Sequence, residues 1–493
     1  MATTVLVSRQ RSETAVAAHR HHLIILTVVF ILTSPLVNPL IHGDGVGYYA
    51  YLRAPLIQHD LQFEPDWRHG NLAFVRNRIN SADQLTSDQF TPTGHINNLF
   101  SVGPAILWAP FFLIAHAAVL IVNRFGGNLA ADGFSLPYRV LVAFGSAFYG
   151  FCGLVLSYLL ARKYVHASWA LLATLGVWIG SSLPVYMYFD PFWSHAHSAF
   201  AVALFLWYWD RTSPNRTFGQ WLLLGLISGL MLNVYFPNGA FLLVPFVESV
   251  LTYVRSLRSN DRSAFLREFS ANLIFLFACG VSILPTLLTR KIVFGGMFRF
   301  GSYAALPWNW RAPYWFLVLF SSEHGLLSWT PLLGFALLGL FLPSPKGRRT
   351  AAYLALGAAA FLYVISSYPY WSGMSSFGNR FFVSLTPVFV FGLASLLNRA
   401  AGLFRSFKFA FVTQGLTLGI FSLWNLAFIF QWGTHMVPAR GKISWGAMVH
   451  NQFNVPLRLT HSLESYFLHR KDMMQQIEQE DIEQQKSEKI QEN

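Results

Sequence analysis

An aspartate between two glycines, followed by three tyrosines, is the strongest sign of chemistry in this sequence. Residues 42–51 read His-Gly-Asp-Gly-Val-Gly-Tyr-Tyr-Ala-Tyr and directly follow a long apolar run. A carboxylate at the end of a membrane-spanning segment is costly unless it is solvated or used, and glycines let a backbone turn and a substrate approach closely. Asp44 is therefore a candidate catalytic residue, with Tyr48 and Tyr49 as candidate substrate contacts. The alternative is a glycine-rich turn capped by Asp44, beside an interfacial belt of tyrosines.

A second acid stands in a comparable setting, in residues 188–197, which read Tyr-Phe-Asp-Pro-Phe-Trp-Ser-His-Ala-His. Asp190 is the second catalytic candidate, although an Asp-Pro pair also suits a helix start that the acid caps. His195 and His197 would point about 200° apart on a helix and make a poor chelating pair. One of them, with His195 preferred, could join a carboxylate around a metal. The alternative is a pair of interfacial histidines satisfied by water.

Two further segments place polar residues beside apolar runs. In residues 321–331, Glu323 and His324 precede such a run, where an acid favoured by a helix N-terminus is the plain explanation. Residues 371–380 end in Asn379 and Arg380. The planar fork of arginine matches phosphate oxygens, so Arg380 is a candidate ligand of a lipid phosphate, against a capping or snorkelling arginine. The sequence contains no Walker loop, HExxH, GxSxG or dinucleotide fingerprint, which leaves ATP-driven transport and soluble-type hydrolysis without support.

The composition places these residues in a membrane protein. The chain has 493 residues, of which 54% are hydrophobic and only 12% are charged, and its mean hydropathy is +0.42. A soluble domain is roughly a quarter charged. The net charge of +13 lies in short clusters between apolar runs, as in cytoplasmic loops, which argues against nucleic acid as a partner. Cys152 and Cys279 lie inside apolar runs and form no disulfide framework or metal motif.

Eleven apolar runs are long enough for spanning helices. They lie near residues 23–41, 137–161, 168–187, 195–209, 219–235, 239–254, 271–289, 325–342, 350–367, 381–398 and 409–430. Six basic stretches flank them and hold 17 Lys and Arg residues, namely the N-terminus and residues 162–163, 211–216, 255–267, 346–349 and 399–408. A cytoplasmic N-terminus places each stretch after an even number of crossings, as positive-inside topology requires. Counting the apolar run 99–122 as a span would reverse this parity. Because it contains Gly103, Pro104 and Pro110, we expect an amphipathic or re-entrant element on the outer face.

This threading predicts an all-α polytopic membrane protein whose outer face holds Asp44, Asp190 and Arg380 together. Residues 1–22 would be a cytoplasmic segment, and 23–435 the transmembrane domain, with a first extracytoplasmic loop at 42–136. The apolar run that begins at Leu23 has no small-residue cleavage site, so an uncleaved first helix is expected. The extracytoplasmic tail, 436–493, ends in a Glu-, Gln- and Lys-rich stretch predicted to be a solvated helix or partly disordered.

Three motifs give this chain a resemblance to a known superfamily. They are Gly-Asp-Gly-Val-Gly-Tyr-Tyr-Ala-Tyr-Leu in the first loop, His-Gly-Leu-Leu-Ser-Trp-Thr-Pro and Ser-Phe-Gly-Asn-Arg-Phe-Phe. The chain resembles, over roughly residues 20–435, the GT-C polytopic glycosyltransferases that use polyprenyl-phosphate sugar donors. These include protein O-mannosyltransferases and bacterial lipid A aminoarabinose transferases. The resemblance implies a bundle with juxtamembrane helices in the first loop, an essential first-loop acid at Asp44 and a second acid at Asp190.

Two departures from that pattern bear on the metal and on donor contacts. Many relatives have a second acid where this chain has Gly45, and many have a basic residue near the apex at 233–238, which here reads Asn-Val-Tyr-Phe-Pro-Asn. The sequence specifies no cofactor. A divalent Mg²⁺ or Mn²⁺, if the reaction uses one, would be held by Asp44, Asp190 and His195.

The resemblance implies an enzyme of a bacterial inner membrane that moves a sugar from a polyprenyl-phosphate carrier to a lipid, glycan or protein acceptor outside. Asp44 would take the acceptor proton. Asp190 would orient the acceptor, share a metal or stabilise charge on the sugar, and Arg380, with Arg299 or Arg311, would neutralise the phosphate. The residues expected to line the substrate site are Tyr48, Tyr49, His195, Glu323, His324, Asn379 and Arg380.

Three other functions are open to a chain of this kind. A transporter or flippase would have charged residues at mid-membrane and broken helices related by internal repeats. Here the acids cluster at one predicted face, and no repeat is evident. A polymerase or ligase of surface polysaccharide would differ only in its acceptor. A non-catalytic scaffold would have no use for acids on the outer face.

Overall fold

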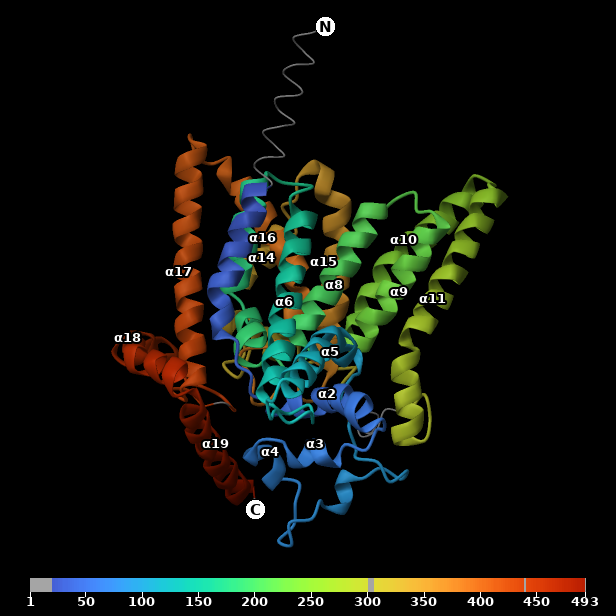
Figure 1. Ribbon diagram of the computed structural model, residues 1–493. Coiled ribbons are helices and arrows are strands. Elements are labelled where there is room, and N and C mark those ends of the chain that lie inside the picture. Colours follow the sequence, from blue (N-terminus) through green and yellow to red (C-terminus); the bar gives the residue numbers. More distant parts are fainter. Residues whose placement is uncertain (1–19, 300–305, 439, 493) are drawn as a thin grey trace.

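The chain folds into a bundle of helices that crosses the membrane several times. The computed structural model describes residues 20–299, 306–438 and 440–492, and in these ranges it contains helices and two isolated bridges but no strand (Figure 1). Seven helices in the described ranges are long and apolar enough to span a bilayer, and three shorter apolar helices join them. The all-α polytopic membrane fold predicted from the sequence is confirmed. Most of the predicted cytoplasmic segment, 1–22, lies outside the described residues.

A helix lies at every predicted span, but the span predicted at 168–187 is not one continuous helix. Its helix ends at Ile179, and bends at residues 180–182 separate it from the short helix η4 (Val185–Phe189). The first span is the apolar helix Arg20–Leu36. Nine others are α6 (Leu136–Ala161), α7 (Ala167–Ile179), α8 (His195–Thr212), α9 (Phe218–Val234), α10 (Leu243–Arg258), α11 (Arg262–Phe294), α15 (Arg348–Ser367), α16 (Thr386–Ala401) and α17 (Phe407–Gly433). Backbone groups inside a bilayer must be satisfied within the segment, which makes a long apolar run a helix.

The span predicted at 325–342 is broken, so the prediction of one continuous helix is wrong there. The structure has two short helices, α13 (Leu326–Trp329) and α14 (Leu332–Gly339). Pro331 has no N–H to donate and disfavours the helical conformation at Thr330. The Thr330 hydroxyl donates to the carbonyl oxygen of Leu326 and so satisfies a backbone group near the break.

Four of the six basic stretches, 162–163, 211–216, 255–267 and 346–349, meet at one end of the bundle, called here the basic end. Lys163 Nζ lies 2.8 Å from Asp210 Oδ2, and the guanidinium groups of Arg216 and Arg349 both contact the Glu248 carboxylate. Figure 1 shows the turn between α10 and α11 at this end as well. Stretches that the positive-inside pattern assigned to one side of the membrane therefore share one end of the fold.

The central helix, α16, fixes the position of Arg380. In the candidate span Arg380–Ala401, 89% of the most apolar stretch is buried inside the protein. In α11, at the edge of the bundle, only 22% of the corresponding stretch is buried. It packs so closely on α14 that a Cβ on Gly392 would lie 2.0 Å from the carbonyl oxygen of Ala336, a contact that small residues permit between membrane helices. The short helix η8 (Arg380–Leu385) leads into α16 and begins with Arg380.

The first loop forms a cap at the end opposite the basic end. It contains α2 (Asp44–Arg53), α3 (Glu64–Arg68), α4 (Leu72–Arg76) and α5 (Gly103–Arg124). By length and composition α5 could span a bilayer. It packs on α2 and on α6, where Trp108 Nε1 donates to Ser146 Oγ at 2.8 Å, and Figure 1 shows it at the cap end of the bundle. Whether it lies on the outer face of the membrane, as expected from the sequence, stays a prediction.

A buried ion pair joins two helices of this cap. Arg53 Nε lies 2.8 Å from Asp66 Oδ1, and Arg53 Nη2 lies 3.2 Å from Asp66 Oδ2. Both side chains are almost completely buried. Burial raises the pKa of Asp66 to about 6, in spite of the attraction of Arg53. At neutral pH the ionised carboxylate therefore depends on Arg53 as its partner.

We expect Arg53→Met to lower the free energy of unfolding by about 3–5 kcal/mol, because it leaves a buried charge without its partner. Thermal unfolding of the purified protein in detergent would show the loss as a lower Tm. In the matched double variant, Arg53→Met/Asp66→Leu, neither charge remains, so most of the stability should return. A double variant as unstable as the single one would contradict the ion-pair explanation.

The C-terminal tail is helical in the described residues. It forms α18 (Trp445–Leu468) and α19 (Arg470–Glu492). Figure 1 shows both helices beside the cap, with α18 crosswise to α17 and α19 running toward α4. Of the two alternatives for its last part, helix or disorder, the structure has a helix.

Candidate active site

Asp44 and Arg380 form an ion pair at the cap end of the bundle. Arg380 Nη1 lies 2.9 Å from Asp44 Oδ2, and the exposed fractions of the two side chains are 10% and 33%. Asp44 is the first residue of α2, where the helix dipole favours a negative charge. The pair is therefore accessible from its carboxylate side, while the arginine is enclosed by protein.

The ring of Trp193 packs against the guanidinium group of Arg380. The Arg380 guanidinium carbon lies 4.4 Å from the centroid of the Trp193 ring, a cation–π distance. Trp193 Nε1 donates to the carbonyl oxygen of His42 at 3.4 Å. Gly43 has a φ of +54°, and a Cβ there would lie 3.3 Å from the Trp193 ring. Glycine is thus needed at 43 for its conformation and for this close approach.

Asp190 pairs with His42 and not with Arg380. His42 Nε2 lies 3.0 Å from Asp190 Oδ1, and the exposed fractions are 26% for His42 and 5% for Asp190. Asp190 follows the short helix η4 (Val185–Phe189), whereas α8 begins later, at His195. The alternative that Asp190 caps the next helix is therefore wrong. Asp190 instead contacts His42, which lies two residues before Asp44.

His195 and His197 point in different directions, as predicted. The His195 ring lies 4.8 Å from Tyr186 and 6.0 Å from Tyr235, centroid to centroid, on the side of Phe381. The His197 ring lies 5.0 Å from Trp108. Both histidines are buried.

The predicted metal ligands have separate partners. Asp44 contacts Arg380, Asp190 contacts His42, and aromatic rings surround His195. Within the described ranges, no group of three or more His, Cys, Asp or Glu side chains could hold a metal ion. Use of a divalent ion remains a prediction.

The two neighbouring tyrosines have different surroundings. Ser194 Oγ donates to the hydroxyl oxygen of Tyr48 at 3.0 Å, which joins Tyr48 to the segment that carries Trp193. The Tyr49 hydroxyl donates to the carbonyl oxygen of Gly133, and its ring packs against Phe112 and Phe192. Only 1% of Tyr49 is exposed, so its position gives no support to the predicted substrate contact.

His324 and Asn379 hold the backbone of the segment that leads to Arg380. His324 Nδ1 lies 2.9 Å from the carbonyl oxygen of Ser372, and burial lowers the pKa of His324 to about 4, so the ring is neutral at neutral pH. Asn379 Nδ2 donates to the carbonyl oxygen of Trp371 at 3.0 Å.

Polar atoms with spare hydrogen-bonding capacity remain near Arg380. Arg380 Nε, Asn379 Oδ1 and His324 Nε2 are buried and have no hydrogen-bond partner among the described residues. Buried polar atoms are rarely left unsatisfied. These three atoms could therefore accept or donate hydrogen bonds to a bound substrate or to water.

The other predicted residues lie nearer the surface. Glu323 is partly exposed, and its backbone N–H donates to Ser321 Oγ at 3.0 Å. Arg299 and Arg311 are exposed, and Arg299 Nη1 donates to the carbonyl oxygen of Phe294 at 3.3 Å. Their roles in the site remain predictions.

The sequence did not single out His42 or Trp193, although both stand in the two acid motifs. A histidine directly before Gly-Asp-Gly, and a tryptophan three residues after Asp190, were the available signals. Their importance depends on the contact between the two motifs, which are far apart along the chain.

The C-terminal tail braces the backbone that leads to the site. Arg470 Nη1 donates to the carbonyl oxygen of Val37 at 2.8 Å, and Tyr466 Oη donates to that of Leu36 at 2.7 Å. Further along, Glu478 Oε1 accepts from the backbone N–H of Ala73 at 3.0 Å. The tail therefore contacts both the connection to His42 and the start of α4.

We expect Arg470→Ala to lower turnover on the order of tenfold, because charged hydrogen bonds that position the His42–Asp44 backbone are lost. Hydrogen–deuterium exchange should rise in peptides covering residues 37–44, while the Tm changes little. The matched control is Lys471→Ala, which removes an exposed neighbouring cation. Equal exchange in both variants would contradict a positioning role for Arg470.

Comparison with known proteins identifies a similar fold but no sequence relative. No family model matches the sequence, and no curated protein matches it. Among solved structures, the fold is similar to the crystal structure of ArnT from Cupriavidus metallidurans in the apo state. The TM-score is 0.48 and the identity 13%, over 91% of this chain and 78% of that one. At this level the likeness concerns the path of the chain alone.

Proposed function

We propose that this membrane protein is a glycosyltransferase that moves a sugar from a polyprenyl-phosphate donor to an acceptor hydroxyl at the cap end of the bundle. The observation that carries the proposal is the Asp44–Arg380 pair, at 2.9 Å, with the carboxylate partly exposed. Transfer from a sugar phosphate needs a base for the acceptor and a cation for the leaving phosphate. Asp44 and Arg380 supply these two groups side by side.

In the proposed reaction the acceptor oxygen attacks the anomeric carbon of the donor sugar. A bond forms between that oxygen and the carbon, and the hydroxyl proton moves to Asp44. The bond between the anomeric carbon and the phosphate oxygen breaks, and its electron pair stays on the phosphate. Polyprenyl phosphate leaves, its negative charge stabilised by Arg380.

Donor binding would also prepare the base. Without substrate, the Arg380 charge is neutralised by Asp44, while Arg380 Nε has no hydrogen-bond partner among the described residues. A phosphate bound in the fork of the guanidinium would draw Arg380 away from Asp44. The carboxylate would then be free to accept the proton.

The residues around the pair would have supporting roles. Asp190 is nearly buried and contacts His42, so we assign it to positioning the first-loop backbone. Trp193 stacks on Arg380 and would restrict its movement. With the basic end in the cytoplasm, as the positive-inside pattern favours, this site would face the outside of the bacterial inner membrane, where a lipid-linked donor replaces a nucleotide sugar.

The test is a donor-consumption assay with purified protein in detergent. Undecaprenyl-phosphate pentoses and hexoses would be offered with a membrane extract as the acceptor source, and release of undecaprenyl phosphate followed by mass spectrometry. Donor consumption that requires Asp44 would support the proposal. Movement of an intact donor across proteoliposome membranes without consumption would instead identify a flippase. An EDTA arm, with Mg²⁺ or Mn²⁺ added back, would decide whether a divalent ion takes part.

A further inference from the structure

Helix α18 has three distinct faces. Met448 and Val455 are buried against the protein. Trp445, Val449, Phe453 and Leu457, spaced four residues apart, are all exposed, with exposed fractions of 58%, 49%, 75% and 81%. On a helix this spacing forms one continuous stripe. The remaining sector is polar and contains the residues His450, Asn454, Arg458 and His461.

Helix α18 contacts a helix whose outer surface is apolar. Helix α17 has the length and hydropathy of a span and exposes the side chains of Leu416, Ile420 and Leu423. In Figure 1, α18 crosses the cap end of α17, and Gln452 Nε2 donates to the carbonyl oxygen of Trp424 at 3.3 Å. A helix at this depth, with one apolar and one polar sector, has the features of helices that lie in a membrane interface.

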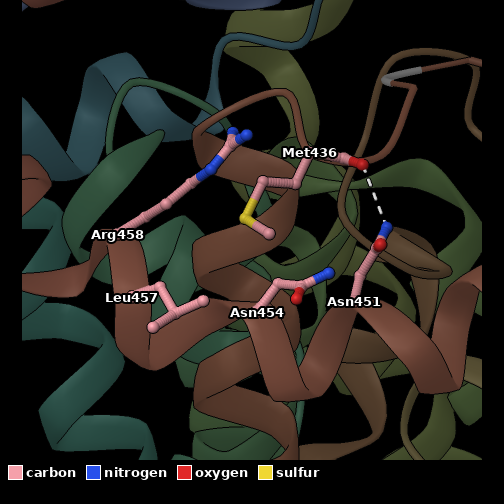
Figure 2. Close-up of a pocket in the computed structure, with 5 residues that line it drawn as sticks. All are labelled: Met436, Asn451, Asn454, Leu457 and Arg458. Atoms are coloured by element: carbon pink, nitrogen blue, oxygen red, sulfur yellow. Dashed lines mark hydrogen bonds between the residues drawn. The ribbon is translucent and has the colours of Figure 1, made fainter.

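A cavity is present on this helix, beside the apolar stripe. It has a volume of about 270 Å³ and is lined by Met436, Asn451, Asn454, Leu457 and Arg458 (Figure 2). Figure 2 shows the Arg458 guanidinium on one side of this space and the two asparagine amides on the other. Asn451 Nδ2 donates to the carbonyl oxygen of Met436 at 3.1 Å. The cavity therefore combines hydrogen-bond donors with apolar contacts from Leu457 and Met436.

The charge around α18 indicates the kind of ligand. Residues 440–471 contain one acid, Glu464, and five Lys or Arg residues, namely Arg440, Lys442, Arg458, Arg470 and Lys471. Arg458 is exposed, and an arginine fork matches phosphate oxygens. Basic residues on an amphipathic helix attract anionic lipids.

We propose that α18 lies in the interface of the membrane at the cap end and that its cavity binds the headgroup of an anionic phospholipid. The phosphate contacts Arg458 and the Asn454 amide, and the acyl chains extend along the stripe that ends at Leu457. This anchors the start of the tail, whose later residues Tyr466 and Arg470 bond the backbone before His42. The inference does not depend on glycosyl transfer, because its tests measure lipid contact and not turnover.

The position of the helix is tested with spin labels in nanodiscs of phosphatidylglycerol and phosphatidylcholine. Cys152 and Cys279 would be replaced by serine, and single labels attached at Val449→Cys or at His461→Cys, an exposed polar-sector position outside the cavity. The two positions lie about 120° apart on the helix. The label at 449 should be more accessible to oxygen, which dissolves in lipid, and the label at 461 to a water-soluble nickel chelate. Equal nickel access at both positions overturns the proposal. So does protection of 449 from both reagents in a dimer, because a second copy would then cover the stripe.

The headgroup site is tested by native mass spectrometry of protein released from the same nanodiscs. Arg458→Ala should retain phosphatidylglycerol on the order of tenfold less well than the unchanged protein, because a charged hydrogen bond to phosphate is lost. Arg458→Lys should recover part of the retention. The matched control is Arg124→Ala, an exposed arginine at the end of α5. Equal retention in Arg458→Ala and Arg124→Ala, with the Tm of each unchanged, overturns the site.

Discussion

Purified Asp44→Asn protein should consume a polyprenyl-phosphate sugar about two to four orders of magnitude more slowly than the unchanged protein, because general base catalysis contributes that much. Asparagine keeps the size of the side chain and its oxygen can still accept a hydrogen bond from Arg380, so the fold should be preserved. The substitution also removes the charge that neutralises Arg380. We therefore expect kcat to fall while the KM for the donor stays the same or falls.

The split between kcat and KM separates a base from a merely structural residue. A structural role would lower the Tm and raise the KM together. The matched control is Asp83→Asn in the same loop, where the side chain is 81% exposed. It should retain full activity. Unchanged turnover in Asp44→Asn would end the assignment of Asp44 as the base, and with it the main support for the proposed mechanism.

Arg380→Ala should lower kcat/KM by about two to three orders of magnitude, the usual effect of removing one group that stabilises charge in the transition state. The reason is that Arg380 is the buried cation beside Asp44 and has a spare donor at Nε. The affinity for free undecaprenyl phosphate, measured separately, should fall as well. Arg380→Lys should recover only part of the loss, because an ammonium group lacks the planar fork.

Two controls make this second prediction specific to the site. Arg299→Ala and Arg311→Ala remove exposed arginines that the sequence left as possible partners of the phosphate. Either variant should retain most activity if Arg380 alone contacts the phosphate. If undecaprenyl phosphate binds Arg380→Ala as tightly as the unchanged protein, the assignment of Arg380 is contradicted. If kcat/KM falls as far in Arg311→Ala as in Arg380→Ala, Arg380 is not the only residue that contacts the phosphate.

The sequence determined where helices form, and it predicted that Asp44 and Arg380 lie at the same end of the bundle. Long apolar runs cannot leave backbone groups unsatisfied in lipid, so helical structure occurs at every predicted span, although the spans predicted at 168–187 and 325–342 are interrupted. The basic stretches could be placed because their charge has a strong preference for one side of a membrane. Asp44 and Arg380 were singled out because charged residues at the ends of apolar runs are costly unless solvated or used.

Only the tertiary structure decided which partners these residues have. Asp44 contacts Arg380 and Asp190 contacts His42, a choice that depends on side-chain distances between segments far apart in the chain. Tyr48 and Tyr49 are adjacent, but one contacts Ser194 and the other is enclosed in the core. Successive helix residues point about 100° apart, and the packing of neighbouring helices decides which side chain turns to the site.

The contacts of the C-terminal tail could not be predicted from the sequence either. Its composition predicted only a solvated helix or disorder, whereas Tyr466 and Arg470 bond backbone carbonyls beside the first loop. A carbonyl oxygen has the same chemistry at every residue, so no pattern in the sequence shows which one a distant arginine will contact. Local periodicity therefore specified the helices of this protein, and long-range packing alone brought the residues of the candidate site together.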